Sequence, residues 1–354
     1  MNEEIKTLGI LGGGQLGRMS AQAAKKLGIK TIIFTSEKDS PASQVADETI
    51  VAAYADLESL RKFSEKVDVI SYEFENIPVE TVEYLTKSKP VYPDKRTLEV
   101  SQDRVSEKSF LNSIGIATTR WEKPLKPENV DEILKKWGKT ECILKTARFG
   151  YDGKGQARYK IGDDITATWR KLKSDHIIVE EIIDFDCEVS VIVGRDRFDK
   201  IVTFGPFLNE HKNHILHKTT FPSGIAADVA AKSIEMTTKL AQQINLRGVI
   251  TLELFLTKQG SILANEIAPR THNSGHLTID ACSISQFEAH VRAVCGLPLT
   301  DPVCEPSEML NLIGDDIKII PQYEGKPGVH VHTYGKMDSR PGRKMGHITT
   351  LKTN

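Results

Sequence analysis

The sequence predicts an α/β and α+β protein of three parts: an N-terminal Rossmann-like parallel sheet, a mixed central domain and a small, mostly β domain at the C-terminus. Near the N-terminus, short apolar strands alternate with helices, which is typical of a parallel sheet. The middle contains strand pairs joined by glycine-rich turns, and part of the last fifty residues alternates as strands do. A chain of 354 residues is also too long for one compact core.

Composition narrows the class of protein. Hydrophobic residues make up 39%, and the net charge of −1 gives no general attraction to nucleic acid or to an anionic membrane. The start of the chain lacks the basic-then-apolar form of a secretion signal, and no apolar run approaches the ~20 residues of a membrane helix. We therefore expect a cytoplasmic protein that binds neither nucleic acid nor a membrane. Five scattered cysteines without a C-x-x-C pair predict reduced thiols, mostly in the core: Cys142, Cys187, Cys282, Cys295 and Cys304.

The first motif is a glycine-rich turn between a strand and a helix. Thr7 to Leu11 is a short apolar strand, and Gly12-Gly-Gly-Gln-Leu-Gly17 leads into a helix that ends near Leu27. This G-x-G-x-x-G arrangement offers backbone N–H groups to an anion. A dinucleotide would also need an acidic residue after the next strand, where only Glu37 is available. A phosphate or phosphoribosyl ligand fits as well as NAD, and a tight turn without ligand is the alternative.

The N-terminal part continues as α/β, with strands at 47–51 and 67–72 and a helix at 57–65 between them. Glu73 and Glu75 follow a strand end, where ligands lie in parallel sheets. They contact substrate or simply solubilise a loop. Further on, Ser101 is expected to be the N-cap of a helix.

A second glycine-rich segment lies in the middle third. Lys145 is on a strand, and residues 147–156 lead from it into the next strand. No helix with Gly-Lys-Ser/Thr follows, so the segment is not a Walker loop. We interpret it as a flap that lays N–H groups over a triphosphate, with Lys145 beneath; a flexible hairpin is the alternative. Three histidines at 211–217 match no zinc spacing and predict a polar loop.

The segment from 249 to 276 predicts a metal site. Two strands are joined by a turn at Gln259-Gly260, and a two-residue turn places Glu253 directly opposite Glu266. A three-residue loop would send the two side chains to opposite faces. Two carboxylates about 5 Å apart are destabilising without a cation, and they are ligands suited to Mg²⁺ that also holds phosphate. A polar loop after a solvated hairpin is the alternative.

Near the C-terminus, His330 and His332 fall on one face of a predicted strand, where a metal or a polar surface would suit them. Lys336 and Arg343 belong to a sharply turned basic loop. An arginine fork with a nearby lysine suits a phosphate monoester, and a solvated surface is the alternative.

Together these motifs resemble the ATP-grasp ligases, and within them the branch that carboxylates aminoimidazole ribonucleotide in purine biosynthesis. The resemblance extends over nearly the whole chain. It implies an N-terminal domain at 1–104, an ATP-grasp domain at 105–300 with a flap subdomain at about 118–183, and a C-terminal domain at 301–354. The matching segments are 12–19, 72–77, 102–104, 150–156, 265–270, 272–276, 309–314 and 340–347.

The resemblance also implies roles for individual residues. Glu253 and Glu266 would hold Mg²⁺, and Arg270, His272 and Asn273 would line the bicarbonate and carboxyphosphate pocket. Asp152 would be a further catalytic residue. Aminoimidazole ribonucleotide would be bound by Gln15, Glu73, Asp152, Lys154, Lys336 and Arg343. ATP would contact Arg104, Lys145, the flap residues Gly150, Tyr151, Asp152, Gly153, Lys154, Gly155 and Gln156, the segment Glu180, Glu181, Ile182 and Ile183, and also Glu188, His211, Asn265 and Glu266.

Four positions depart from the family pattern. Ala268 stands where other ATP-grasp enzymes have a third metal ligand, as it does in this branch. Phe149 and His214 occupy places where glycine is usual, and Thr271 replaces a proline. None of these changes removes a proposed ligand.

The implied activity is an ATP- and bicarbonate-dependent ligase reaction. The resemblance further implies a homodimer and transfer of the product to a carboxyaminoimidazole ribonucleotide mutase. Two other enzymes stay open as alternatives: a formate-dependent glycinamide ribonucleotide ligase and an NAD(P)-dependent oxidoreductase built on the first glycine-rich turn. A nucleotide-binding regulatory module without catalysis is the third.

Overall fold

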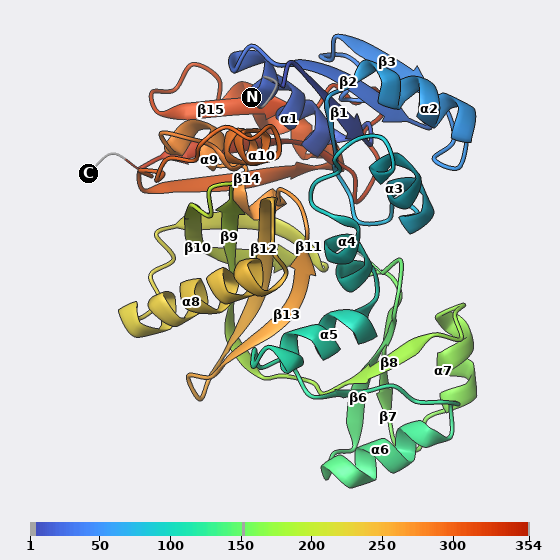
Figure 1. Cartoon of the computed structure of the whole chain (residues 1–354). Coiled ribbons are helices and arrows are strands. Elements are labelled where there is room, and N and C mark those ends of the chain that lie inside the picture. Colours follow the sequence, from blue (N-terminus) through green and yellow to red (C-terminus); the bar gives the residue numbers. More distant parts are fainter. Residues whose placement is uncertain (1–4, 151–152, 353–354) are drawn as a thin grey trace.

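The computed structural model describes residues 5–150 and 153–352, which form three sheets (Figure 1). In this part of the chain, no helix is long and apolar enough to cross a membrane. The strands are β1 Thr7–Leu11, β2 Lys30–Thr35, β3 Glu48–Val51, β4 Val69–Tyr72, β5 Trp121–Glu122, β6 Glu141–Thr146, β7 Gln156–Lys160, β8 Ile177–Glu180, β9 Phe185–Arg195, β10 Ile201–Lys212, β11 Ile215–Phe221, β12 Gly248–Thr257, β13 Ile262–Ala268, β14 Ser307–Ile313, β15 Val329–Thr333 and β16 Lys344–Leu351. The helices are α1 Gln15–Lys26, α2 Leu57–Lys66, α3 Val79–Thr86, α4 Lys95–Gln102, α5 Arg104–Ser113, α6 Asn129–Trp137, α7 Ile165–Lys171, α8 Ala227–Gln243, α9 Thr278–Ala281 and α10 Gln286–Val294, with 3₁₀ turns at Asn273–Gly275 and Gly314–Gln322.

The N-terminal lobe is a parallel sheet, as the strand-helix alternation predicts. Its strand order is β3-β2-β1-β4, and each neighbouring pair runs parallel. Residues 8–11 of β1 are buried, as expected for a strand covered on both faces. The turn after β1 and the loop after β4 therefore emerge at the same edge of the sheet, beside each other.

The flap lobe, residues 121–180, is a separate antiparallel sheet of order β5-β8-β6-β7 with α6 and α7. Figure 1 shows it projecting from the rest of the chain, joined through α5 and the start of β9. Its core cluster is drawn entirely from its own residues and includes Leu134, Trp137, Leu144 and Tyr159. The predicted flap is the connection between β6 and β7, where Lys145 pairs with Gln156.

The largest sheet has eight antiparallel strands in the order β13-β12-β9-β10-β11-β14-β16-β15. Its first five strands belong to the middle of the chain and its last three to the C-terminus, and β11 pairs with β14 where they meet. The histidine-rich segment predicted as a loop is instead the hairpin of β10 and β11, with its turn at Asn213 and His214. That prediction was wrong because buried positions of these strands carry polar side chains, such as Asn209 and Thr219, so the sequence does not alternate between apolar and polar residues.

The N-terminal lobe shares its core with the large sheet's helices. One buried cluster combines Leu8 of β1, Phe287 and Val291 of α10, and Tyr334 near the C-terminus. Buried His290 adds a polar connection, because its Nε2 lies 2.8 Å from Ser71 Oγ of β4 and its Nδ1 accepts from Val249 N–H of β12 at 3.2 Å. The N-terminal lobe is therefore fixed to the large sheet.

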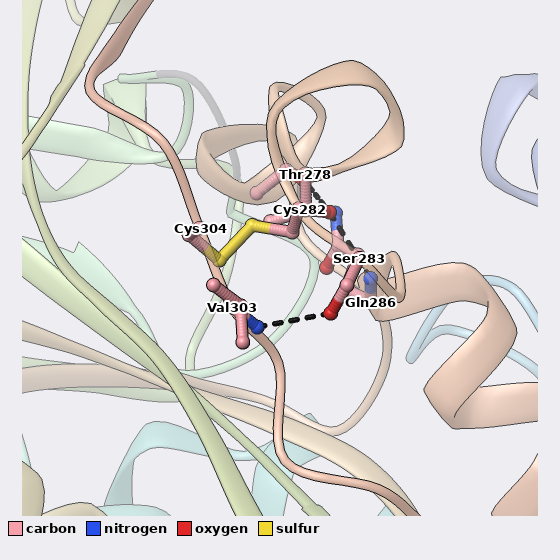
Figure 2. Close-up of a disulfide and its surroundings, with 7 residues drawn as sticks. Thr278, Cys282, Ser283, Gln286, Val303 and Cys304 are labelled. Carbon is pink, nitrogen blue, oxygen red and sulfur yellow. Dashed lines mark hydrogen bonds between the residues drawn. A yellow bond between two sulfur atoms is a disulfide. The ribbon is translucent and has the colours of Figure 1, made fainter.

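Two of the five cysteines are paired, which corrects the prediction of reduced thiols. Cys282 and Cys304 form a disulfide between the end of α9 and the crossover that precedes β14 (Figure 2). The backbones pair as an isolated antiparallel bridge at these residues. Cys142 and Cys295 are free and buried, and Cys187 is free and partly buried. The prediction failed because 22 residues separate the partners in sequence and only the tertiary path of the crossover brings them together.

Candidate active site

A cavity of about 930 Å³ opens between the N-terminal lobe, the flap lobe and the large sheet. This volume is at the upper end for small-molecule sites and is large enough for a nucleotide. The predicted residues that line it are Gln15, Glu73, Arg104, Lys145, Gly150, Gly153, Lys154, Gln156, Glu180, Glu181, Ile182, Ile183, Glu188, His211, Glu253, Asn265, Glu266, Arg270, His272 and Asn273.

The β12–β13 hairpin places Glu253 directly opposite Glu266, as predicted, although by another route. The turn has three residues, 258–260, which alone would put the two glutamates on opposite faces. A β-bulge at Asn265 adds one residue to β13 and restores the pairing. The bulge also turns Asn265 toward the cavity that it lines. The pairing was therefore right and the predicted turn was wrong.

Each of these carboxylates is held by a donor side chain. Glu253 Oε1 lies 2.8 Å from His272 Nε2, and Glu266 Oε2 accepts from Arg104 at 3.1 Å. Burial alone would raise the pKa of Glu253, but His272 and the other cationic side chains nearby outweigh it and bring that pKa to about 2. His272 is oriented from behind, because its Nδ1 lies 2.8 Å from Ser274 Oγ. Glu253 is thus ionised and available to a cation at neutral pH.

Two further ligand-type side chains lie beside Glu253. Glu188, His211 and Glu253 each present one atom within 4.8 Å of the other two, and His211 Nδ1 is 3.3 Å from Glu188 Oε2. Burial favours neutral His211, but Glu188 and Glu253 outweigh it and raise the pKa of His211. These two predicted nucleotide contacts therefore adjoin the predicted metal pair.

Helix α5 carries the cations that face this centre. Its N-cap is Asp103, which accepts from Val105 N–H at 2.9 Å, so the expectation that Ser101 caps a helix was wrong. Ser101 instead lies inside α4, near its end, because the chain bends only at Asp103. The bend lets Arg104 begin α5 and reach Glu266.

A buried charge network joins α5 to the flap lobe. Glu180 accepts from Lys145 at 2.8 Å and lies 3.4 Å from Lys108 Nζ. Burial alone would raise the pKa of Glu180, but Lys145, Lys108 and Arg104 outweigh it and lower that pKa to about 2. The Glu180 side chain therefore positions two lysines. Residues 181–183, which follow it, line the cavity and are less buried, so they can contact the base of a nucleotide.

The first glycine-rich turn is filled by a carboxylate from the chain itself. Gly14 N–H and Gly17 N–H both donate to Glu73, the latter at 2.6 Å. A side chain at Gly12 could not be accommodated, because its Cβ would lie 2.2 Å from Glu73 Cγ. A pyrophosphate would have to displace this buried carboxylate, so the geometry argues against a dinucleotide and against the oxidoreductase alternative. Glu73 remains at the cavity wall, where it can meet another ligand.

The residues predicted to handle bicarbonate lie together on the cavity wall. Arg270 donates from Nε to Glu75 at 2.6 Å, so this second acidic residue after β4 orients the guanidinium. Asn273 is 8% exposed, and both its amide atoms lack hydrogen-bond partners within the described residues. A buried amide with unused donor and acceptor capacity fits a small polar ligand.

Family comparisons agree with this geometry. Residues 109–287 match the ATP-grasp domain, residues 5–102 the ribonucleotide synthetase preATP-grasp domain, and residues 307–354 the phosphoribosylaminoimidazole carboxylase C-terminal domain. A relative from Brucella melitensis biotype 1, named N5-carboxyaminoimidazole ribonucleotide synthase, is 45% identical over 98% of this chain and 96% of its own length. The chain belongs to the N5-carboxyaminoimidazole ribonucleotide synthase family.

Solved structures of the family superpose on nearly the whole chain. An N5-carboxyaminoimidazole ribonucleotide synthetase in complex with ADP has a TM-score of 0.94 at 37% identity, covering 99% of this chain and 95% of its own. The Aspergillus clavatus enzyme, solved with ADP and 5-aminoimidazole ribonucleotide, has a TM-score of 0.90 at 28% identity, covering 98% and 94%. The resemblance of the motifs to ATP-grasp ligases is therefore confirmed.

The basic loop near the C-terminus lies beside the cavity and not on its wall. Lys344 lines the cavity, whereas Lys336 and Arg343, which were predicted to hold phosphate, do not. Lys336 donates to the Lys344 carbonyl at 2.7 Å, and Arg343 donates to the Asp338 carbonyl at 3.0 Å. Burial and nearby Arg343 lower the pKa of Lys336 to about 8.

The flap is described in part. Tyr151 and Asp152, predicted as ligand contacts, lie outside the described residues. Gly155 does not line the cavity; its φ of +72° and its contact with Thr146 make it a turn residue. Its predicted role as a direct ATP contact is therefore not supported by this geometry.

Two of the departures from the family pattern share a physical cause. Phe149 has φ +62° and His214 has φ +64°, a left-handed conformation that favours glycine. His214 also faces the flap, because a Cβ added at Gly153 would lie 2.6 Å from His214 Cβ. The chain thus places two larger residues at glycine-like positions in the cavity lining.

Several residues that line the cavity or lie directly behind its wall escaped the sequence reasoning. Glu107 accepts from Ile267 N–H, and burial raises its pKa to about 8. Lys108 bonds to Thr119 and Glu180. The spacing of Glu107 and Lys108 from Arg104, three and four residues along one helix, was a usable signal for a shared face. Phe185 and Phe255 stack with centroids 4.7 Å apart, and no local pattern pairs them.

Proposed function

We propose that this chain carboxylates 5-aminoimidazole ribonucleotide with ATP and bicarbonate, giving 5-(carboxyamino)imidazole ribonucleotide, ADP and phosphate. The observation that carries the proposal is the opposed pair of Glu253 and Glu266 in one cavity with Lys145, Arg104 and the bicarbonate residues. The Aspergillus clavatus relative was solved with ADP and the same imidazole ribonucleotide.

The reaction needs positioning and charge neutralisation. Bicarbonate oxygen takes the γ-phosphoryl group of ATP, which gives carboxyphosphate and ADP, and the substrate amine then attacks the carboxyl carbon, or CO₂ released from it, with loss of phosphate. Lys145 and Arg104 would neutralise the phosphoryl oxygens, and the Gly150–Gln156 flap would exclude water from the anhydride. Phosphoryl transfer of this kind requires no protein nucleophile.

The opposed carboxylates fit Mg²⁺. Glu253 is ionised and faces Glu266 across the hairpin, and both line the cavity. These two residues would hold the ion, which would supply charge to the β- and γ-phosphate oxygens. His272 now bonds Glu253; when that carboxylate is otherwise engaged, its Nε2 becomes available to move a proton at the substrate amine.

Arg270 and Asn273 would bind bicarbonate. The Arg270 fork is buried and already oriented by Glu75, so its remaining donors can meet a carboxylate-like ligand. Gln15 and Glu73 would contact the imidazole ribonucleotide from the N-terminal lobe, and Lys154 would contact it from the flap. Asp152, which lies outside the described residues, remains a proposed contact from the sequence alone. Lys336 and Arg343 remain proposed phosphate contacts, and they would need to move toward the cavity when substrate binds.

The test is ADP release by the purified chain. Release should depend on both aminoimidazole ribonucleotide and bicarbonate, and Glu266→Gln should lower it at least roughly 100-fold because one carboxylate is lost from the phosphoryl-transfer centre. Glu235→Gln, at an exposed position on α8, is the matched control and should leave the rate unchanged. Unchanged turnover in Glu266→Gln would overturn the metal assignment.

The same assay separates the alternative ligase. A formate-dependent glycinamide ribonucleotide ligase would release ADP with formate and glycinamide ribonucleotide, and would ignore bicarbonate. We also retain three proposals that follow from the family alone: a homodimer, a cytoplasmic location and transfer of the product to a mutase. The Cys282–Cys304 disulfide is an observation against a cytoplasmic location, because disulfide bonds are rare in a reducing cytosol.

A further inference from the structure

A second group of metal-ligating side chains lies outside the cavity, where α9 packs against the β15–β16 hairpin. Asp280 of α9, His332 of β15 and His347 of β16 each present one ligand atom, and these atoms lie within 4.8 Å of one another. His347 is fully buried, whereas the His332 side chain is 31% exposed, so the group runs from the core to the surface. We call these three residues the α9–hairpin cluster.

Strand register brings the two imidazoles together. His332 lies directly opposite His347 in the β15–β16 pair, which puts both side chains on one face of the sheet. Their rings stack with centroids 4.6 Å apart and planes 17° apart. His330 follows on the same face, and its Nδ1 lies 3.7 Å from Asp280 Oδ1.

Asp280 supplies the negative charge. Its two carboxylate oxygens lie 2.8 Å and 3.1 Å from His332 Nε2, and its side chain is only 10% exposed. A carboxylate close to two or three imidazoles is a common donor set for zinc-type ions. Magnesium and calcium prefer oxygen ligands alone, so the histidines select against them.

The hydrogen bonds of His347 leave one nitrogen for a ligand. The Tyr334 hydroxyl lies 2.8 Å from His347 Nδ1 and 3.0 Å from His276 Nδ1, and it has one hydrogen to donate. When it donates to His276, His347 Nδ1–H donates to the tyrosine oxygen and Nε2 keeps a free lone pair. His347 Nε2 is buried and has no hydrogen-bond partner within the described residues. Burial also keeps the pKa of His347 well below its usual value, so the ring is neutral.

We propose that the α9–hairpin cluster binds a divalent transition-metal ion of the zinc type through the Asp280 carboxylate, His332 Nε2 and His347 Nε2. His330 or a water would complete the coordination, and Tyr334 would orient His347 from outside the coordination shell. The ion would take the place of the hydrogen bond that now joins His332 Nε2 to the Asp280 carboxylate. This site is independent of the proposed reaction.

The site would fix one part of the molecule relative to another. Helix α9 begins two residues after His276, the last residue of the catalytic turn, and the β15–β16 connection carries Lys336 and Arg343. A bound ion would hold that basic connection against the segment that leads from Arg270 and His272. Its role is therefore positional, and no catalytic step passes through it.

Cobalt titration of the full chain, after treatment with a chelator, tests the proposal. Bound Co²⁺ is followed by its visible absorption and counted by metal analysis, and Zn²⁺ should displace it. Because Glu188, His211 and Glu253 can also bind Co²⁺, differences between variants are compared and totals are not. Nitrogen and oxygen ligands predict d–d bands without sulfur-to-cobalt charge transfer.

Three variants give graded expectations. His332→Gln and Asp280→Asn should each weaken one equivalent of Co²⁺ more than about 100-fold, and Tyr334→Phe, which removes only the outer partner, roughly 10- to 100-fold. His217→Gln, a half-buried histidine on β11, is the control and should keep that equivalent. Zn²⁺ should raise the melting temperature of the natural chain by more than that of His332→Gln, and the difference between the two is the measure. Equal Co²⁺ binding in His332→Gln and the natural chain, or a sulfur charge-transfer band, would overturn the proposal.

Discussion

The N-terminal lobe and the flap lobe both line the cavity, but they are attached to the molecule in different ways. The N-terminal lobe shares a buried cluster with α10 and with Tyr334, and His290 bonds it to the large sheet. The flap lobe has a core of its own, which contains only residues from 130 to 179. A lobe with a private core can open locally, whereas a lobe with a shared core opens only when its neighbours do.

The same contrast extends to their glycine-rich loops. In the N-terminal lobe the turn at Gly12 to Gly17 is already filled by Glu73, which arrives from the end of β4. The flap connects β6, which carries Lys145, to β7, and its residues Gly150, Gly153 and Lys154 line the cavity. Similar sequence patterns therefore serve two purposes: one forms a closed turn and the other lines a cavity.

Matched leucine substitutions in the two lobes should give the largest effects on stability and on hydrogen exchange. Leu8→Ala in β1 and Leu134→Ala in α6 remove the same group from fully buried positions, and each should cost about 2–5 kcal/mol. Hydrogen exchange should accelerate only in the flap lobe for Leu134→Ala, because its core is private. For Leu8→Ala it should accelerate in the N-terminal lobe and in α10 together.

Nucleotide affinity gives a second measurement on the same pair. Leu134→Ala should weaken ATP binding, since Lys145 belongs to the lobe that loosens. If both variants gave the same exchange pattern across the chain, the two lobes would be equally attached and the contrast would be wrong.

The second-largest effect should be a loss of stability in acid at His290, the residue that bonds the N-terminal lobe to the large sheet. Burial lowers the pKa of His290 to about 4, below the ordinary value of 6.5, so the folded chain binds fewer protons at this site than the unfolded chain between those pH values. Stability at this site is therefore present above pH 6.5 and is lost as pH falls toward 4, by about 3 kcal/mol at most. The free energy of unfolding, measured by urea denaturation across this window, should fall less steeply in His290→Gln.

The matched control is Gln242→Ala, at an exposed position of α8 that carries no ionisable group. It should leave the slope of stability against pH unchanged. If the free energy of unfolding fell equally with pH in His290→Gln and in the natural chain, His290 would not contribute to the pH dependence of stability.

The smallest effect on stability is expected at the turn of residues 12–17, where Glu73 accepts two backbone hydrogen bonds. Glu73→Gln replaces one carboxylate oxygen by an amide nitrogen, a donor that faces one backbone N–H group and leaves it without an acceptor, which should cost about 1–3 kcal/mol. Urea denaturation checks this, with the exposed Glu37→Gln as the control in the same lobe. A loss no greater than that of the control would mean that the carboxylate does not hold the turn closed.

Local patterns predicted most of the fold and the centre of the site. Strand β1 begins and ends at the predicted residues, because apolar runs bounded by turn residues specify buried strands. Glu253 and Glu266 were correctly paired by counting register. The count succeeded only because the bulge at Asn265 compensates for a longer turn, and no sequence rule used here places a bulge.

Long-range features account for what was missed. Glu73 reaches Gly14 across 59 residues, and the Cys282–Cys304 disulfide depends on the path of a crossover. Lys108 was overlooked because a lysine on a helix is usually solvated, whereas here a buried glutamate keeps it in the core. Such pairings depend on tertiary structure, so motifs alone cannot reveal them.

The pairing of β11 with β14 has a practical consequence for dissecting this enzyme. The last fifty residues look like an appendage along the chain, but they supply the next strand of the sheet that carries Glu253 and Glu266. A fragment that ends before β14 would expose β11 as a raw sheet edge, and such edges recruit other molecules into aggregates. Studies of the nucleotide-binding half in isolation should therefore keep the C-terminal strands.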